Sequence, residues 1–185
     1  MAAMQQPLCD FGWKAPPFSL QDPDGHTYNL ESVKGPNGVV VMFICNHCPY
    51  VRAVVDRIVR DARDLQTIGV GVIAVMPNDY VNYPADAPPK MKQFAAEHGF
   101  TFPYVIDETQ DVARAYDAVC TPDFFGFNRD LELQYRGRLD PSRQNPAPPD
   151  APRELYEAMR QVAETGAGPR HQEPSMGCSI KWKSA

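Results

Sequence analysis

Two cysteines stand three residues apart in the segment Cys45-Asn46-His47-Cys48, which Pro49 follows directly. A C-x-x-C segment where a strand gives way to a helix is typical of a thiol–disulfide redox centre. The free N–H groups at a helix start and the positive end of the helix dipole stabilise a thiolate. We expect Cys45 at or just before the first helical turn and Cys48 one turn further in, within reach of the Cys45 sulfur.

Two other interpretations of this segment stay open. Cys45, His47 and Cys48 are residue types that zinc accepts as ligands, although the chain holds no second C-x-x-C pair and no H-x-x-x-H pair. The two cysteines could also be buried and inert, which a location at a helix start disfavours. We expect no metal and no other cofactor.

The elements that must position the cysteines form a strand–helix–strand unit. Residues 39–44 are apolar without alternation, as in a parallel strand buried on both faces. Residues 51–65 place their apolar side chains at helical spacing and their charges on the other face. Residues 70–75 read as a second buried strand, so we expect parallel pairing through a right-handed crossover.

The rest of the chain predicts a single domain over residues 1–185. The expected class is α/β, with a central mixed sheet flanked by helices around a core at 38–140. Before and after the strand–helix–strand unit we expect an N-terminal β-hairpin at 16–30 and an irregular proline-rich loop at 77–89. A short helix from Met91 to Gly99, a strand at 104–106 and a helix from 109 to 119 should follow. The last expected elements are a β-hairpin of residues 124–127 and 133–139, a linker at 141–152, and a C-terminal helix and docking tail at 152–185.

Composition narrows the function further. Of 185 residues, 43% are hydrophobic and 22% charged, which excludes general disorder. The longest apolar run, residues 39–45, is far shorter than the roughly 20 residues that cross a membrane. A net charge of −5 disfavours nucleic-acid binding. The N-terminus shows no signal-peptide pattern, so we expect a cytoplasmic protein, where closely spaced cysteines are catalytic or bind metal more often than they form structural disulfides.

Three segments of the sequence resemble a known group of proteins: residues 43–51, residues 78–91 and residues 177–182. With them the chain resembles the thioredoxin superfamily, specifically the bacterial thioredoxin-like proteins grouped with the AhpC/TSA (redoxin) domain. The resemblance implies a thioredoxin-like fold, a redox centre at Cys45 and Cys48, and Thr121-Pro122 as a cis-proline loop that faces it. The residues alone favour a trans bond, since only about 5–6% of X–Pro bonds in folded proteins are cis.

The function expected from these observations is that of a thiol–disulfide oxidoreductase. Cys45 attacks a disulfide of a protein or an oxidised small thiol, and Cys48 resolves the mixed disulfide. Asn46 and His47 support the pair, and a charge on His47 would favour the Cys45 thiolate. We therefore expect a potential nearer the roughly −180 mV of disulfide isomerase than the roughly −270 mV of thioredoxin, a resting dithiol, and an electron donor that the sequence does not identify. The backbone of Thr121 is free, in this view, to pair with an extended substrate.

Three questions stay open at this level. The strand at 39–44 holds no acid, so the proton of Cys48 passes to water, to His47, or to a carboxylate such as Asp79 or Asp86. A peroxiredoxin-like peroxidase is the rival enzyme, disfavoured because the residue three before Cys45 is methionine instead of threonine. A metal- or thiol-binding adaptor without turnover is the other alternative.

Three cysteines lie outside the C-x-x-C segment. Cys120 precedes Thr121 and is expected to be a small buried hydrophobe more than an additional thiol of the site. Cys178 lies in the tail with Ile180 and Trp182, whose apolar side chains predict that the tail docks on the domain. A relay to the active site and a structural role are equally expected for Cys178, and Cys9 is expected to be an incidental thiol.

Overall fold

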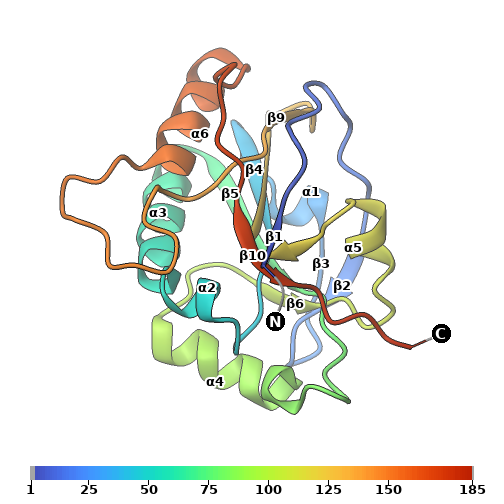
Figure 1. Ribbon diagram of the computed structural model, residues 1–185. Helices are drawn as coiled ribbons and strands as arrows, with labels where there is room; N and C mark the ends of the chain where they lie inside the picture. Colours follow the sequence, from blue (N-terminus) through green and yellow to red (C-terminus); the bar gives the residue numbers. More distant parts are fainter. Residues whose placement is uncertain (1–2, 185) are drawn as a thin grey trace.

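A mixed seven-stranded sheet with helices on both faces forms the centre of the computed structural model, which describes residues 3–184 (Figure 1). In spatial order the strands are β3 (Thr27–Asn29), β2 (Ser19–Gln21), β6 (Tyr104–Ile106), β5 (Val70–Met76), β4 (Gly38–Phe43), β8 (Asp123–Phe127) and β9 (Leu133–Tyr135). Strands β4, β5 and β6 are parallel to one another, and the other pairs are antiparallel. The expected α/β class with a central mixed sheet is confirmed.

Within residues 3–184, six helices and one 3-10 turn flank this sheet. They are α1 (Leu30–Val33), α2 (Pro49–Arg52), α3 (Val55–Thr67), η1 (Pro84–Asp86), α4 (Pro88–His98), α5 (Asp111–Ala115) and α6 (Glu154–Thr165). Apolar residues of α3, α4 and α6 share one core with Val40 and Met42 of β4. Leu30 of α1 and Ala113 of α5 share the core on the opposite face with Val41.

Strand β4 lies in the middle of the sheet, and all six of its residues are buried. Burial on both faces explains why its sequence does not alternate between apolar and polar residues. Each fully buried Val or Met side chain contributes roughly 1.5–3 kcal/mol of transfer free energy. The predicted strand–helix–strand unit is confirmed, since β4 pairs in parallel with β5 and α3 connects them. The carboxyl end of β4 is therefore a rigid support for the segment that follows it.

The helix predicted over residues 51–65 is divided in two. Helix α2 ends at Arg52 and α3 begins at Val55. The N–H of Val54 bonds to the carbonyl oxygen of Val51, three residues back, so the regular ladder of hydrogen bonds is interrupted there. The first helix after the cysteines is consequently a single short turn.

The proline-rich segment 77–89 is more regular than predicted. It contains η1, and α4 begins at Pro88 instead of near Met91. Proline is tolerated in a first helical turn, because its missing N–H would have no partner there. The helix predicted over 109–119 is also shorter than expected: α5 ends at Ala115, and Asp117 adopts a positive φ of 54°.

Both predicted hairpins are present at the two sides of the sheet. Strands β2 and β3 pair with each other, and Gln21 of β2 also pairs with Ile106, so this hairpin extends the main sheet. Strands β8 and β9 form the hairpin at the opposite edge.

The C-terminal tail docks on the domain, as predicted, but through a second sheet that was not predicted. Strand β10 (Met176–Ser179) lies between β1 (Ala3–Gln5) and β7 (Cys120–Thr121) and is antiparallel to both. Figure 1 shows β1 and β10, which come from the first and last parts of the chain, side by side at this place. The tail is thus fixed to the segment that carries Thr121.

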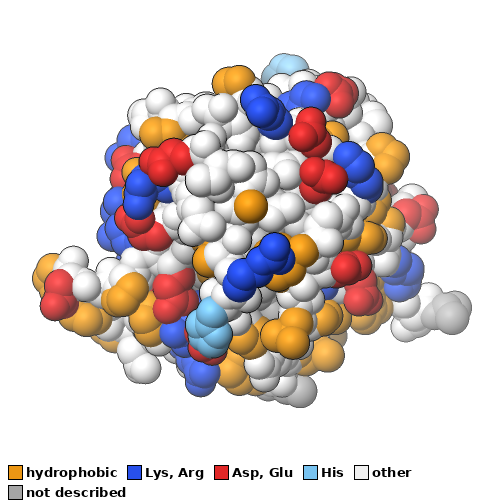
Figure 2. Space-filling model, turned by 90° about the horizontal axis from the view of Figure 1, so that it is seen from above, with side chains coloured by type: hydrophobic (Ala, Val, Ile, Leu, Met, Phe, Trp, Pro, Cys, Tyr) orange, Lys and Arg blue, Asp and Glu red, His pale blue; other side chains and the backbone are white. Residues whose placement is uncertain are grey.

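The face of the molecule that Figure 2 shows carries charges of both signs. Figure 2 shows acidic and basic side chains interspersed on the upper face of the molecule. Within residues 3–184, no helix combines the length and the apolar character needed to cross a membrane.

Candidate active site

Cys45 and Cys48 lie just beyond the carboxyl end of β4, and both side chains are buried. Helix α2 begins at Pro49, which makes Cys48 its N-cap residue. The expectation that Cys45 starts the helix and Cys48 lies one turn in is therefore wrong. The reason is that the residues between the two cysteines form a bend, and the helix starts only at the proline. The N–H groups of the first turn consequently favour a thiolate at Cys48.

The two thiols of the pair differ in acidity. Interaction with Cys45 lowers the pKa of Cys48 to about 5, opposed by burial and reinforced by Cys178, Thr121 and the N–H of Val51. The pKa of Cys45 is raised well above its usual value, first by its interaction with Cys48 and then by burial and the Asp86 carboxylate. These two directions favour a thiolate on Cys48 over a thiolate on Cys45 in the reduced pair.

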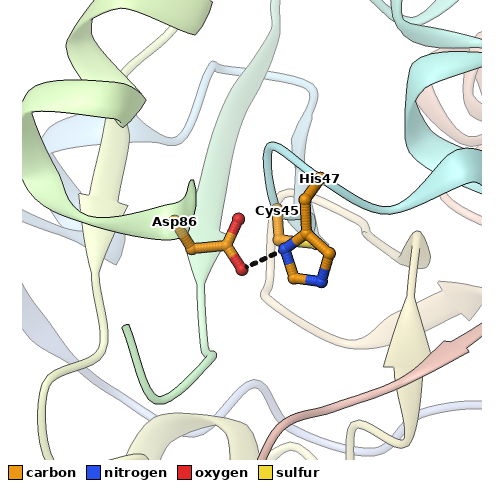
Figure 3. Close-up of side chains that lie close together, drawn as sticks. All are labelled: Cys45, His47 and Asp86. Atoms are coloured by element: carbon orange, nitrogen blue, oxygen red, sulfur yellow. Dashed lines mark ion pairs between the residues drawn. The ribbon is translucent and has the colours of Figure 1, made fainter. Parts of the chain in front are cut away.

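His47 points toward Asp86, which lies in η1 of the proline-rich segment (Figure 3). The Nδ1 atom of His47 is 2.6 Å from Oδ2 of Asp86, whose side chain is fully buried. This contact raises the pKa of His47. The negative charge of Asp86 therefore balances a positive charge on His47. The sequence predicted that a charged His47 would favour a thiolate on Cys45, and the Asp86 carboxylate offsets that effect.

Asp86 and Asn46 hold the bend between the cysteines in place. The N–H of Asn46 donates to Oδ1 of Asp86 at 2.8 Å, and the Asn46 amide donates to the carbonyl oxygen of Ala85 at 3.0 Å. The hydroxyl of Tyr104 donates to Oδ1 of Asn46 at 2.9 Å. Asn46 is thus a positioning residue. Asp79, the other carboxylate considered from the sequence, bonds instead to Asn82 within its own loop.

Thr121 and Pro122 face the two cysteines across the site. The peptide bond between them is cis, as the resemblance implies. The Thr121 hydroxyl lies 3.6 Å from Sγ of Cys45, and its carbonyl oxygen lies 3.2 Å from Sγ of Cys48. The backbone of Thr121 is already paired with Cys178 of β10. The pairing of the Thr121 backbone with an extended substrate therefore stays a prediction that requires β10 to leave this edge, because the chain's own tail occupies it.

The remaining cysteines differ in their relation to the site. Sγ of Cys178 lies 2.8 Å from Sγ of Cys48, which brings together residues 130 positions apart in the chain. Cys120 is fully buried, and burial raises the pKa of its thiol, in keeping with the expected small buried hydrophobe. Cys9 is half-buried, and burial raises its pKa to about 11. None of the five cysteines, all of which lie within residues 3–184, forms a disulfide in the structure.

Donor atoms of Cys45, His47 and Asp86 lie within 4.8 Å of one another, and zinc accepts all three residue types (Figure 3). Both carboxylate oxygens of Asp86 already have partners, however. Oδ1 accepts from the N–H of Asn46, and Oδ2 accepts from the Asn78 amide and contacts His47. This arrangement suits the holding and transfer of a proton next to Cys45.

The fold and the cysteine site define a thioredoxin-like protein. The fold is shared with the thioredoxin domain of a thiol-disulfide oxidoreductase from Bacteroides vulgatus, at a TM-score of 0.57 and 19% identity over 68% of this chain and 86% of that one. The sequence model of the AhpC/TSA family matches residues 11–136. The chain belongs to the AhpC/TSA family.

Two further relatives extend the comparison. The crystal structure of an uncharacterized conserved protein from Geobacillus kaustophilus is similar over 100% of this chain and 98% of that chain, with 47% identity and a TM-score of 0.93. A protein of Mycobacterium tuberculosis named "Putative peroxiredoxin MT2597" is 27% identical over 62% of this chain and 68% of its own length. Both thiol–disulfide oxidoreductases and peroxiredoxins are therefore among the proteins that this chain resembles.

Proposed function

We propose that this protein is a thiol–disulfide oxidoreductase that reduces disulfides of proteins or of oxidised small thiols through Cys45 and Cys48. The observation that carries the proposal is the pair of buried sulfurs that contact Thr121, Cys45 at its hydroxyl and Cys48 at its carbonyl oxygen. A thiolate beside a protonated thiol is the arrangement that disulfide exchange needs, because one sulfur attacks while the other resolves the mixed disulfide.

The reaction transfers two electrons from the cysteine pair to the substrate disulfide. One cysteine sulfur attacks a substrate sulfur, the substrate disulfide breaks, and the first substrate thiolate leaves. The other cysteine then attacks the first, which forms the Cys45–Cys48 disulfide and releases the second substrate thiol. A dithiol donor returns the two electrons.

The order of attack follows from the acidity of the two thiols. The sequence placed the mixed disulfide at Cys45, whereas the pKa of Cys48 is lowered and the pKa of Cys45 is raised. We therefore favour attack by Cys48 and resolution by Cys45. In that order Cys45 must lose a proton, and the Asp86–His47 pair, within 4.8 Å of its sulfur, is the proposed acceptor.

A peroxidase is the second candidate. The Thr121 hydroxyl, 3.6 Å from Sγ of Cys45, supports it, as does the similarity to the Mycobacterium tuberculosis protein. The buried Asp86 carboxylate opposes it, because a negative charge near Cys45 disfavours the thiolate that must attack peroxide.

The deciding experiment measures reduction of insulin disulfides by the purified full-length protein with dithiothreitol as the donor. We expect turnover that is lost in Cys48→Ser and in the Cys45→Ser/Cys178→Ala double variant and kept in Cys120→Ala, a matched change at a buried thiol outside the pair. Rapid peroxide consumption without insulin reduction would instead identify a peroxidase. Stoichiometric zinc or copper without either activity would identify a binding protein.

A further inference from the structure

Strand β10 places Cys178 against Cys48. Its backbone pairs with β7 on one side, through Cys178 opposite Thr121, and with β1 on the other, through Cys178 opposite Ala3. The Cys178 side chain is 4% exposed and the Cys48 side chain 0%. The 2.8 Å separation of the two sulfurs is therefore set by backbone pairing on both sides of β10.

Gly177 permits the close approach of β10 to the cysteine site. A Cβ atom at this position would lie 2.0 Å from the carbonyl oxygen of Thr121 and 3.1 Å from the nitrogen of Pro122. Any other residue would push the strand away from β7. The absence of a side chain here thus brings Cys178 to Cys48.

The chemistry of the two sulfurs is complementary. Burial raises the pKa of Cys178 to about 12, with a further contribution from Cys48, so Cys178 holds its proton beside the Cys48 thiolate. A disulfide has an S–S distance of about 2.05 Å, so the two sulfurs need to approach by less than about 1 Å to bond. Cys48 therefore has two thiol neighbours, Cys45 and Cys178.

We propose that Cys178 is a third redox-active thiol that shares Cys48 with Cys45, so that the oxidised protein contains a Cys48–Cys178 disulfide in exchange with the Cys45–Cys48 disulfide. The inference rests on the proposed function, whose substrate oxidises the Cys45–Cys48 pair. In the exchange step the Cys178 sulfur attacks Sγ of Cys48. The Cys48–Cys178 bond forms, the Cys45–Cys48 bond breaks, and the proton of Cys178 passes to the departing Cys45 thiolate.

The exchange moves no electrons, and a dithiol donor reduces either disulfide. It returns Cys45 to the thiol form while the protein remains oxidised. Cys178 also becomes a second resolving thiol for a mixed disulfide on Cys48: it attacks Cys48, and the substrate sulfur leaves with the proton. The C-terminal strand thereby takes part in the reaction in addition to covering the site.

Peptide mapping of the oxidised wild-type protein tests the proposal without any variant. The full-length reduced protein is oxidised with one equivalent of diamide, alkylated in denaturant, digested with trypsin and analysed without reduction. Cleavage after Lys34, Arg52, Arg170 and Lys181 places Cys45 and Cys48 in one peptide and Cys178 in another. We expect the two peptides to be joined, with the alkyl group on Cys45. An internal Cys45–Cys48 link with Cys178 fully alkylated would overturn the proposal.

Variants provide a second test by turnover. In Cys45→Ala, Cys178 should resolve the mixed disulfide with insulin, and the Cys45→Ala/Cys178→Ala double variant should accumulate it. Equal accumulation in both would contradict a resolving role for Cys178. Cys120→Ala is the matched control and should retain the cross-link.

The two proposals can fail separately. Insulin reduction without any Cys48–Cys178 link would leave the proposed function intact and refute the third thiol. The cross-link without reduction of insulin would support the third thiol and overturn the proposed function.

Discussion

Replacing Cys45 with alanine should raise the pKa of Cys48 above its value of about 5 and shift the midpoint of its titration upward by about 1–2 pH units. The interaction with Cys45 is the largest of the effects that lower this pKa. A hydrogen bond to a charged group is worth about 1.5–3 kcal/mol, and each 1.36 kcal/mol changes a pKa by about one. The alternative location of the charge, on Cys45, is disfavoured by burial and by Asp86.

The assay is a pH titration of thiolate absorbance in the ultraviolet, checked by the pH dependence of alkylation of the reduced protein. Wild type should show one midpoint near pH 5. Cys178→Ala should shift the midpoint upward by less than Cys45→Ala does, because Cys178 contributes less to the lowering of the Cys48 pKa. Cys120→Ala should leave it unchanged.

The outcome that refutes this reasoning is a low midpoint that survives Cys48→Ala and disappears in Cys45→Ala. The thiolate would then lie on Cys45, as the sequence-based order of attack requires. An unchanged midpoint in Cys45→Ala would show instead that the N-cap position alone stabilises the Cys48 thiolate.

Three further predictions concern the surroundings of the pair. Asp86→Asn should lower the pKa of His47 and cost about 2 kcal/mol, or about 4–8 °C in Tm, measured by thermal unfolding. Because the pKa of His47 is raised in the folded state, protonated His47 stabilises the fold fully below about pH 6.5, and this stabilisation is lost as the pH rises through the raised pKa. A Tm difference between wild type and Asp86→Asn that does not change with pH in this range would contradict the ion pair. Gly177→Val should displace β10 from Thr121 and accelerate alkylation of Cys48 about tenfold for each 1.4 kcal/mol of lost pairing; an unchanged rate would show that β10 does not limit access. The free energy of unfolding of the reduced protein should rise between about pH 5 and pH 9, because the pKa of Cys48 is lower in the folded state than in the unfolded state. The stabilisation is complete above the unfolded-state pKa and is lost as the pH falls through the folded-state pKa. The same rise in Cys48→Ala would exclude Cys48 as the cause.

The sequence predicted the central part of the fold well because local patterns encode it. The apolar run at 39–44, the amphipathic stretch after it and the run at 70–75 each reveal an element without knowledge of its neighbours. Both hairpins and the final helix are confirmed for the same reason.

Errors arose where the contacts are not local. The bend that makes Cys48 the N-cap residue depends on Asp86, which accepts the N–H of Asn46 from 40 residues away. The start of α4 at Pro88 depends on which backbone N–H groups remain unpaired in the folded chain. Neither interaction leaves a periodic signal in the sequence.

What the sequence by itself indicated is the candidate redox pair, a C-x-x-C segment after a buried strand. The family resemblance implied that Thr121-Pro122 faces this pair as a cis-proline loop, and the structure has the cis bond. Only the tertiary structure supplies the contacts that lower the pKa of Cys48 and places a third thiol, Cys178, beside it. Acidity depends on donors and charges that converge in space, from Cys45, Cys178 and the first turn of α2. The contact between Cys48 and Cys178 depends on strand pairing across 130 residues, which no local pattern specifies.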